Sequence, residues 1–169
     1  MKKMLKENDF ENVVWDFLFT YRQLLLNGNL HKKVDSEAYQ KNPATWNTVL
    51  LSLETGVVLG LAKLLEENYF GREFNSPELN QISIKITNMR NSLIAHNDLS
   101  IMRNRKPFIE ENQLTGTDII KMIDAIKNRA IQYQKAFGAK IEVQKLFEET
   151  TRNAMTDLDN WLKSFGIPL

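Results

Sequence analysis

The sequence predicts an all-α protein, built as an up-and-down bundle of about five helices. Hydrophobic residues recur at every third or fourth position along nearly the whole chain, and no segment alternates as a half-buried strand would. The seven glycines and four prolines among 169 residues are too few for a turn-rich sandwich or barrel. This length suits one domain with a real core, so residues 1–169 are expected to form a single helical domain.

The first predicted helix spans about residues 8–27. Its hydrophobic stripe ends at Asn27-Gly28-Asn29, residues that favour a helix C-terminus. Residues 29–42 are polar and irregular, with one helical turn expected around residues 36–40. His31 is therefore interpreted as a solvated loop residue.

Pro43 opens the second predicted helix, which spans about residues 44–68. Gly56 and Gly60 lie four positions apart, so they share one face and would let another helix approach closely. We interpret this pair as a packing detail rather than as a dimer seam. Residues 71–75 are expected to be a linker.

The third predicted helix begins at Ser76-Pro77, an N-cap residue followed by a proline at the first helical position. It should end near residues 96–99, and residues 100–114 should form a loop.

A fourth helix is expected to start at Thr115 or Thr117 and to end or kink at Gly138. A last helix is expected over about residues 140–164.

The overall charge lacks the basic bias expected of a protein that coats nucleic acid. The 22 basic and 21 acidic side chains leave a formal net charge of +1, so a nucleic-acid substrate would have to be held by a local patch. The absence of cysteine indicates a reducing compartment, and the polar N-terminal run predicts no signal peptide. No stretch approaches the roughly 18 uncharged apolar residues of a membrane span. A cytoplasmic protein is expected.

Three polar residues interrupt the third predicted helix in the run MRNSLIAHND, residues 89–98. On a helix, Arg90 and His96 would point about 120° apart and lie about 9 Å apart along the axis, so both could flank one groove. His96 would fall in the last turn, where the helix dipole favours a protonated imidazole. Asn91 adds a neutral donor and acceptor beside the arginine.

These residue types suit metal-independent cleavage of RNA. Histidine can transfer the proton that activates the ribose 2′-hydroxyl or the one that leaves with the 5′-oxygen, and arginine can stabilise charge on the phosphorus. One histidine can hardly fill both roles, so two copies would have to meet in a symmetric dimer. A structural interpretation stays open, in which Arg90 pairs with Glu54 or Asp98 and His96 only ends a helix.

The same run resembles the signature of the HEPN superfamily, an arginine and a polar neighbour followed at short spacing by a histidine. Arg90, Asn91 and His96 match these positions, with five residues between the arginine and the histidine. The ending Ala95 to Asp98 and the preceding helix, residues 44–65, are similar to the abortive-infection (AbiU-type) branch. The resemblance covers residues 46–98, and the rest of the chain shares only helical character.

The resemblance implies a HEPN-like bundle and a metal-independent ribonuclease of the toxin or phage-defence type, without a cofactor or metal site. It implies a homodimer with the two signature helices face to face. Many such proteins are neutralised by a partner, commonly a small nucleotidyltransferase-like antitoxin. Others have lost cleavage and only bind a nucleotide, RNA or a partner protein, which is the alternative expectation for this chain.

The basic segment after His96 is a candidate for holding flanking phosphates of an RNA substrate. The expected substrate-binding residues are Asp98, Arg103, Arg105 and Lys106. A solvated run of charges is an equally good interpretation of these positions. No histidines lie at metal-ligand spacing, and no glycine-rich phosphate loop is present.

Overall fold

The computed structural model describes residues 5–94 and 110–164, and within these ranges every regular element is a helix. The all-α prediction is therefore confirmed for the described chain. The helices are α1 (Glu7–His31), α2 (Glu37–Lys41), α3 (Pro43–Leu64), α4 (Pro77–Ile94), α7 (Gly116–Phe137) and α8 (Val143–Ser164).

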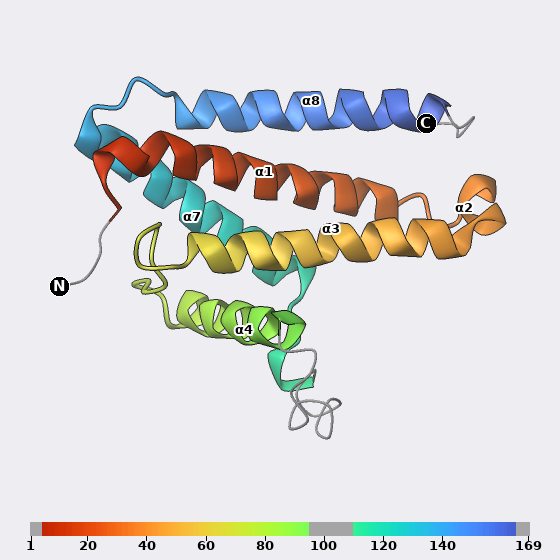
Figure 1. The fold of residues 1–169 in the computed structure, drawn as a ribbon, viewed down its shortest axis with the longest axis horizontal. Helices are drawn as coiled ribbons and strands as arrows, with labels where there is room; N and C mark the ends of the chain where they lie inside the picture. The colour runs from red at the N-terminus through yellow and green to blue at the C-terminus, as the bar shows by residue number, and fades with distance from the viewer. Residues whose placement is uncertain (1–4, 95–109, 165–169) are drawn as a thin grey trace.

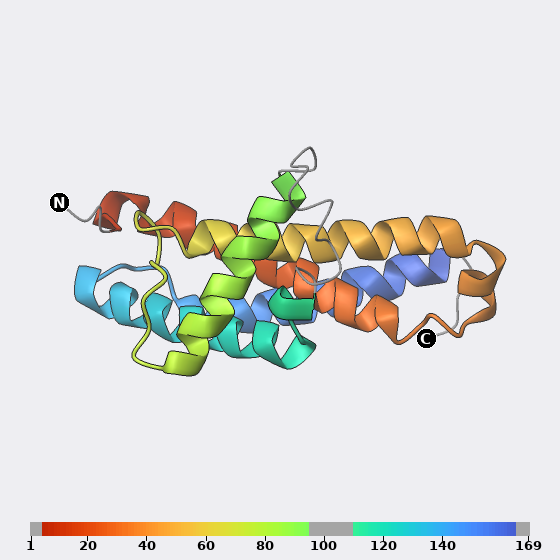
Figure 2. The same ribbon diagram turned by 90° about the horizontal axis from the view of Figure 1, so that it is seen from below.

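The helices form a layered bundle in which α8, α1 and α3 lie side by side along the long axis (Figure 1). α3 runs antiparallel to α1, whereas α8 runs in the same direction as α1. α4 crosses α3 steeply instead of lying along it, and it also packs against α7 (Figure 2). The described helices are therefore arranged less regularly than in the simple up-and-down bundle that the sequence predicts.

Two hydrophobic clusters hold the described helices together. The larger one is centred on the fully buried Phe17 of α1, whose ring makes edge contacts with Phe147 of α8 at 4.7 Å and with Phe70 at 6.0 Å between centroids. The smaller cluster lies where α1, α3 and α8 meet near α2, and it includes Leu30, Leu50, Leu158 and Leu162. α8 contributes to both clusters, so it links the two ends of the bundle.

The first helix extends four residues beyond its predicted C-terminal end, because tertiary contacts override the Asn27-Gly28-Asn29 stop. Leu30 is only 4% exposed, so continuing the helix buries it in the smaller cluster. The side-chain amides of Asn27 and Asn29 donate to the carbonyls of Leu50 and Leu25 rather than ending the helix. The interpretation of His31 as a loop residue is wrong.

The other boundaries agree better with local sequence. α4 begins at Pro77 with Ser76 as cap, and Thr115 caps α7 through a reciprocal pair of hydrogen bonds with Asp118. Gly138 ends α7 in the left-handed conformation. Two predictions fail: α3 ends at Leu64 instead of near residue 68, and residues 110–112, expected in a loop, are helical. The last helix starts at Val143, slightly later than expected.

Among the described residues one helix, α3, is long and apolar enough to cross a membrane by length and composition alone. The core helix of a soluble protein passes the same test, and 28% of its apolar window is buried inside the structure. α3 packs against both α1 and α4 and carries Glu54, whose carboxylate bonds the His31 imidazole at 2.9 Å. α3 thus has packing partners within the described chain, and the cytoplasmic location stays a prediction.

Gly56 and Gly60 are packing glycines, as interpreted from the sequence. A Cβ at Gly60 would overlap the side chain of Thr20 on α1, and one at Gly56 would overlap Gln23. Thr20 is 2% exposed and its hydroxyl bonds the Asp16 carbonyl at 3.0 Å, so it has no room to withdraw. Gln23 is long and flexible and can move aside.

We expect Gly60→Ala to lower the free energy of unfolding by about 1–3 kcal/mol, because the added methyl group overpacks the seam between α1 and α3. Gly28→Ala is the matched control, since a Cβ there meets nothing within 4 Å. It should raise stability by about 0.5–1 kcal/mol through helix propensity. Urea denaturation of both variants measures the difference, and equal stabilities would contradict close packing at Gly60.

Candidate functional site

Arg90 lies in the last turns of α4 with its side chain 25% exposed. Its Nη1 donates to Oε1 of Glu66 at 3.0 Å, and its Nε donates to Oδ1 of Asn91 at 3.3 Å. No acceptor among the described residues bonds Nη2. The guanidinium is thus held on one side and retains donors for another anion.

Of the predicted catalytic set, the structure brings Arg90 and Asn91 together at the end of α4. α4 is described as far as Ile94, two positions before His96. The remaining predicted site residues lie outside the described chain: His96, Asp98, Arg103, Arg105 and Lys106. The expected end of the third helix near residues 96–99 lies outside it as well.

Glu66 is a site residue that the sequence analysis missed. The structural interpretation expected Arg90 to pair with Glu54 or Asp98, but Glu54 pairs with His31 instead. The second predicted helix, expected over about residues 44–68, would have included Glu66 in its last turn. In the structure it follows the end of α3, in the turn that leads back towards α4.

The turn after α3 is compact, and it includes residues 65–73. Phe70 is buried in the larger cluster, and its backbone N–H bonds the Leu64 carbonyl. Gly71 takes a positive φ of 74°, which favours glycine, and its N–H bonds the Glu66 carbonyl at 3.0 Å. These backbone hydrogen bonds fix the position of the Glu66 backbone, and so the point from which its side chain extends.

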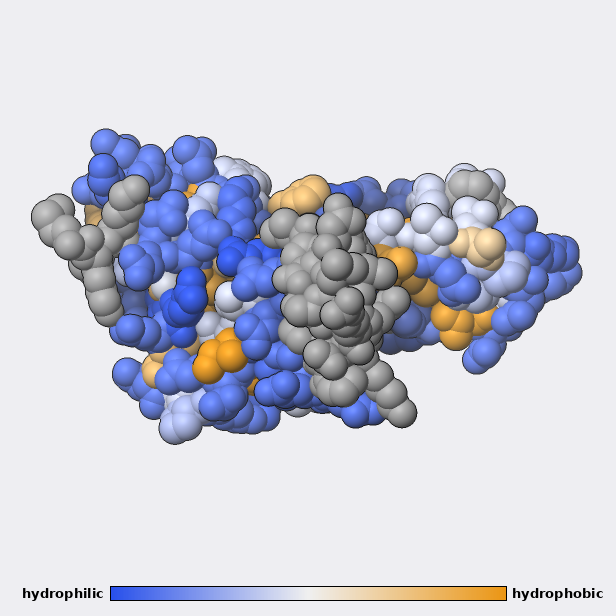
Figure 3. Space-filling view, turned by 60° about the horizontal axis from the view of Figure 1, so that its bottom comes forward, coloured by the Kyte–Doolittle hydropathy of each residue, from blue (hydrophilic) through white to orange (hydrophobic). Residues whose placement is uncertain are grey.

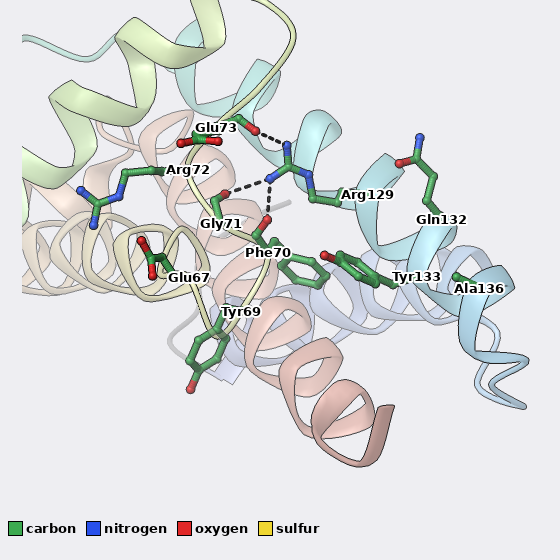
Figure 4. Close-up of a pocket in the computed structure, with 10 residues that line it drawn as sticks. All are labelled: Glu67, Tyr69, Phe70, Gly71, Arg72, Glu73, Arg129, Gln132, Tyr133 and Ala136. Atoms are coloured by element: carbon green, nitrogen blue, oxygen red, sulfur yellow. Dashed lines mark hydrogen bonds between the residues drawn. The ribbon is translucent and has the colours of Figure 1, made fainter. Parts of the chain in front are cut away.

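Arg129 of α7 anchors the same turn (Figure 4). Its guanidinium donates to three backbone carbonyls, those of Phe70, Gly71 and Glu73, and stacks over the Phe74 ring at 4.1 Å. Burial lowers the pKa of Arg129 from its ordinary value. This side chain is committed to backbone acceptors, so it is a structural cation rather than a ligand-binding one.

A pocket of about 660 Å³ opens between this turn and α7. Its lining mixes both charge signs, with Arg72 and Arg129 beside Glu67 and Glu73, and Phe70 and Tyr133 form an apolar wall (Figure 4). The mixed charges give it no preference for an anion, and it does not include Arg90. Within the described ranges no cluster of three His, Cys, Asp or Glu side chains could hold a metal ion.

The surface on the α4 side is largely hydrophilic, with scattered hydrophobic side chains (Figure 3). Ile84 of α4 and Leu51 of α3 are 52% and 64% exposed.

Comparison of the chain with protein-family models, curated proteins and solved structures finds no match. The functional assignment therefore depends on the residues of the site itself.

We expect Arg129→Ala to lower the free energy of unfolding by about 1.5–3 kcal/mol, because three carbonyls lose a charged donor. Arg129→Lys should rescue little of this loss, since an ammonium group lacks the planar fork. Arg152→Ala, at an exposed position on α8, is the matched control and should be nearly neutral. Thermal denaturation of the three variants tests this prediction. An Arg129→Ala variant as stable as the wild type would show that Arg129 does not anchor the turn.

Proposed function

We propose that the protein is a metal-independent endoribonuclease of the HEPN type, of toxin or phage-defence character, acting as a cytoplasmic homodimer. The observation that carries the proposal is the pose of Arg90, half-buried, fixed by Glu66 and Asn91, and with Nη2 unbonded by the described residues. A preorganised cation of this kind suits a transition state that gathers negative charge on phosphorus.

Each residue of the sequence motif has one role in the proposed reaction. Arg90 stabilises the charge on the pentavalent phosphorus, and Asn91 orients the phosphate. His96 of one protomer removes the proton of the 2′-hydroxyl, which attacks the phosphorus. His96 of the second protomer protonates the departing 5′-oxygen, so the site is complete only in the dimer.

The substrate in this proposal is single-stranded RNA, held by a local patch because the whole chain is nearly neutral. The patch consists of Asp98, Arg103, Arg105 and Lys106. A nucleotidyltransferase-like antitoxin is the proposed inhibitory partner, by the resemblance alone.

The second candidate function is a non-catalytic HEPN-like module that binds a nucleotide, RNA or a partner protein. It is favoured by the pairing of Arg90 with Glu66, since a carboxylate partly neutralises the cation that would attract a phosphate. This alternative predicts saturable binding that weakens when Arg90 is replaced, without turnover of any RNA.

We expect the purified wild-type dimer to cleave single-stranded RNA in the presence of EDTA. His96→Ala should reduce the rate about 10²–10⁴-fold through loss of proton transfer, and Arg90→Ala about 10²–10³-fold through loss of charge stabilisation. Gel analysis of labelled RNA measures the rates, and light scattering checks the dimer.

Arg152→Ala serves as the control for a lost surface cation and should cleave at the wild-type rate. Inhibition by EDTA, or full activity in His96→Ala, would refute the mechanism. If both residues are only structural, His96→Ala should instead cost about 1–3 kcal/mol of stability.

A further inference from the structure

The contact between Glu66 and Arg90 joins a partly exposed carboxylate, in a hydrogen-bonded turn, to the last turns of α4. Glu66 is 43% exposed on its side chain, yet its backbone is bonded on both sides, with its N–H to Lys63 and its carbonyl to the N–H groups of Tyr69 and Gly71. These bonds fix the backbone position from which the Glu66 side chain reaches Arg90. Here the fold brings the carboxylate to Arg90.

The anchor of this turn lies on a different helix from Arg90. Arg129 on α7 holds the carbonyls of Phe70, Gly71 and Glu73, and Gly71 in turn bonds the Glu66 carbonyl. Hydrogen bonds, joined by the covalent structure of Glu66 itself, thus connect α7 through the turn to α4. Their end point is the Nη1 of Arg90.

We propose that Glu66 is the positioning residue of Arg90, a role that rests on the proposed ribonuclease function. Its Oε1 accepts from Nη1 and so fixes the plane of the guanidinium, which leaves Nη2 to meet the scissile phosphate. The carboxylate contributes by orienting the Arg90 guanidinium and not through its charge, because a negative charge at this position opposes phosphate binding. An acceptor without charge at this position would therefore preserve the function.

Four variants of the full-length dimer test this role: Glu66→Ala, Glu66→Gln, Glu67→Ala and Glu67→Gln. Glu67 adjoins Glu66 in the same turn, and in Figure 4 it lies towards Arg72. The Glu67 variants change the local charge equally without removing the contact to Arg90. Steady-state cleavage of a labelled single-stranded RNA gives kcat and KM for each.

Glu66→Ala should lower kcat about 10- to 100-fold, because a misdirected guanidinium no longer matches the transition state. Glu66→Gln retains an oxygen acceptor, so it should keep kcat within a few-fold of the wild type and lower KM. Both Glu67 variants should keep the wild-type kcat. In an Arg90→Ala background Glu66→Ala should cost nothing more, because the two changes remove one interaction.

Failure of this inference differs from failure of the proposed function. If the wild type cleaves RNA in a His96-dependent manner but Glu66→Ala keeps its kcat, or loses it additively with Arg90→Ala, Glu66 is only structural and the function stands. If Glu66→Gln is as slow as Glu66→Ala, charge rather than direction matters and the inference is overturned. If the wild type does not cleave RNA, both proposals fall.

Discussion

The guanidinium of Arg129 is the interaction on which the candidate site depends, although it lies on α7 and touches no predicted catalytic residue. It binds three carbonyls in a turn that no helix or sheet ladder could satisfy. The turn sets the direction in which the chain leaves α3, and therefore the way α4 crosses it. The path of the turn and the crossing of α4 over α3 together determine the relative positions of Arg90 and Glu66.

The parts of the fold that local chemistry decides could be predicted from the sequence. The start of α4 at Ser76-Pro77, the capping pair of Thr115 and Asp118, and the left-handed Gly138 each depend on neighbours within a few residues. The glycine spacing on α3 likewise predicted a close helix contact, because the shared face of residues four apart follows from helix geometry alone. It did not identify the partner helix.

The parts that tertiary contacts decide could not be predicted. The Asn27-Gly28-Asn29 stop was overridden by burial of Leu30 against α3 and α8, which are distant in sequence. The early end of α3 depends on Phe70, which enters the core beside Phe17. Since Glu66 reaches Arg90 only through that turn, the motif around Arg90 was visible in the sequence while the carboxylate that holds it was not.

The smaller hydrophobic cluster holds together the end of the bundle that carries α2. Trp46 and Trp161 meet there at 5.3 Å between centroids, and α2 contacts little besides α3. Such an end can open by local unfolding while the larger cluster around Phe17 stays closed. Amide hydrogens of α2 and of the last turns of α8 should then exchange with solvent sooner than those of α1 around Phe17, so that opening at this end leaves the contact between Glu66 and Arg90 intact.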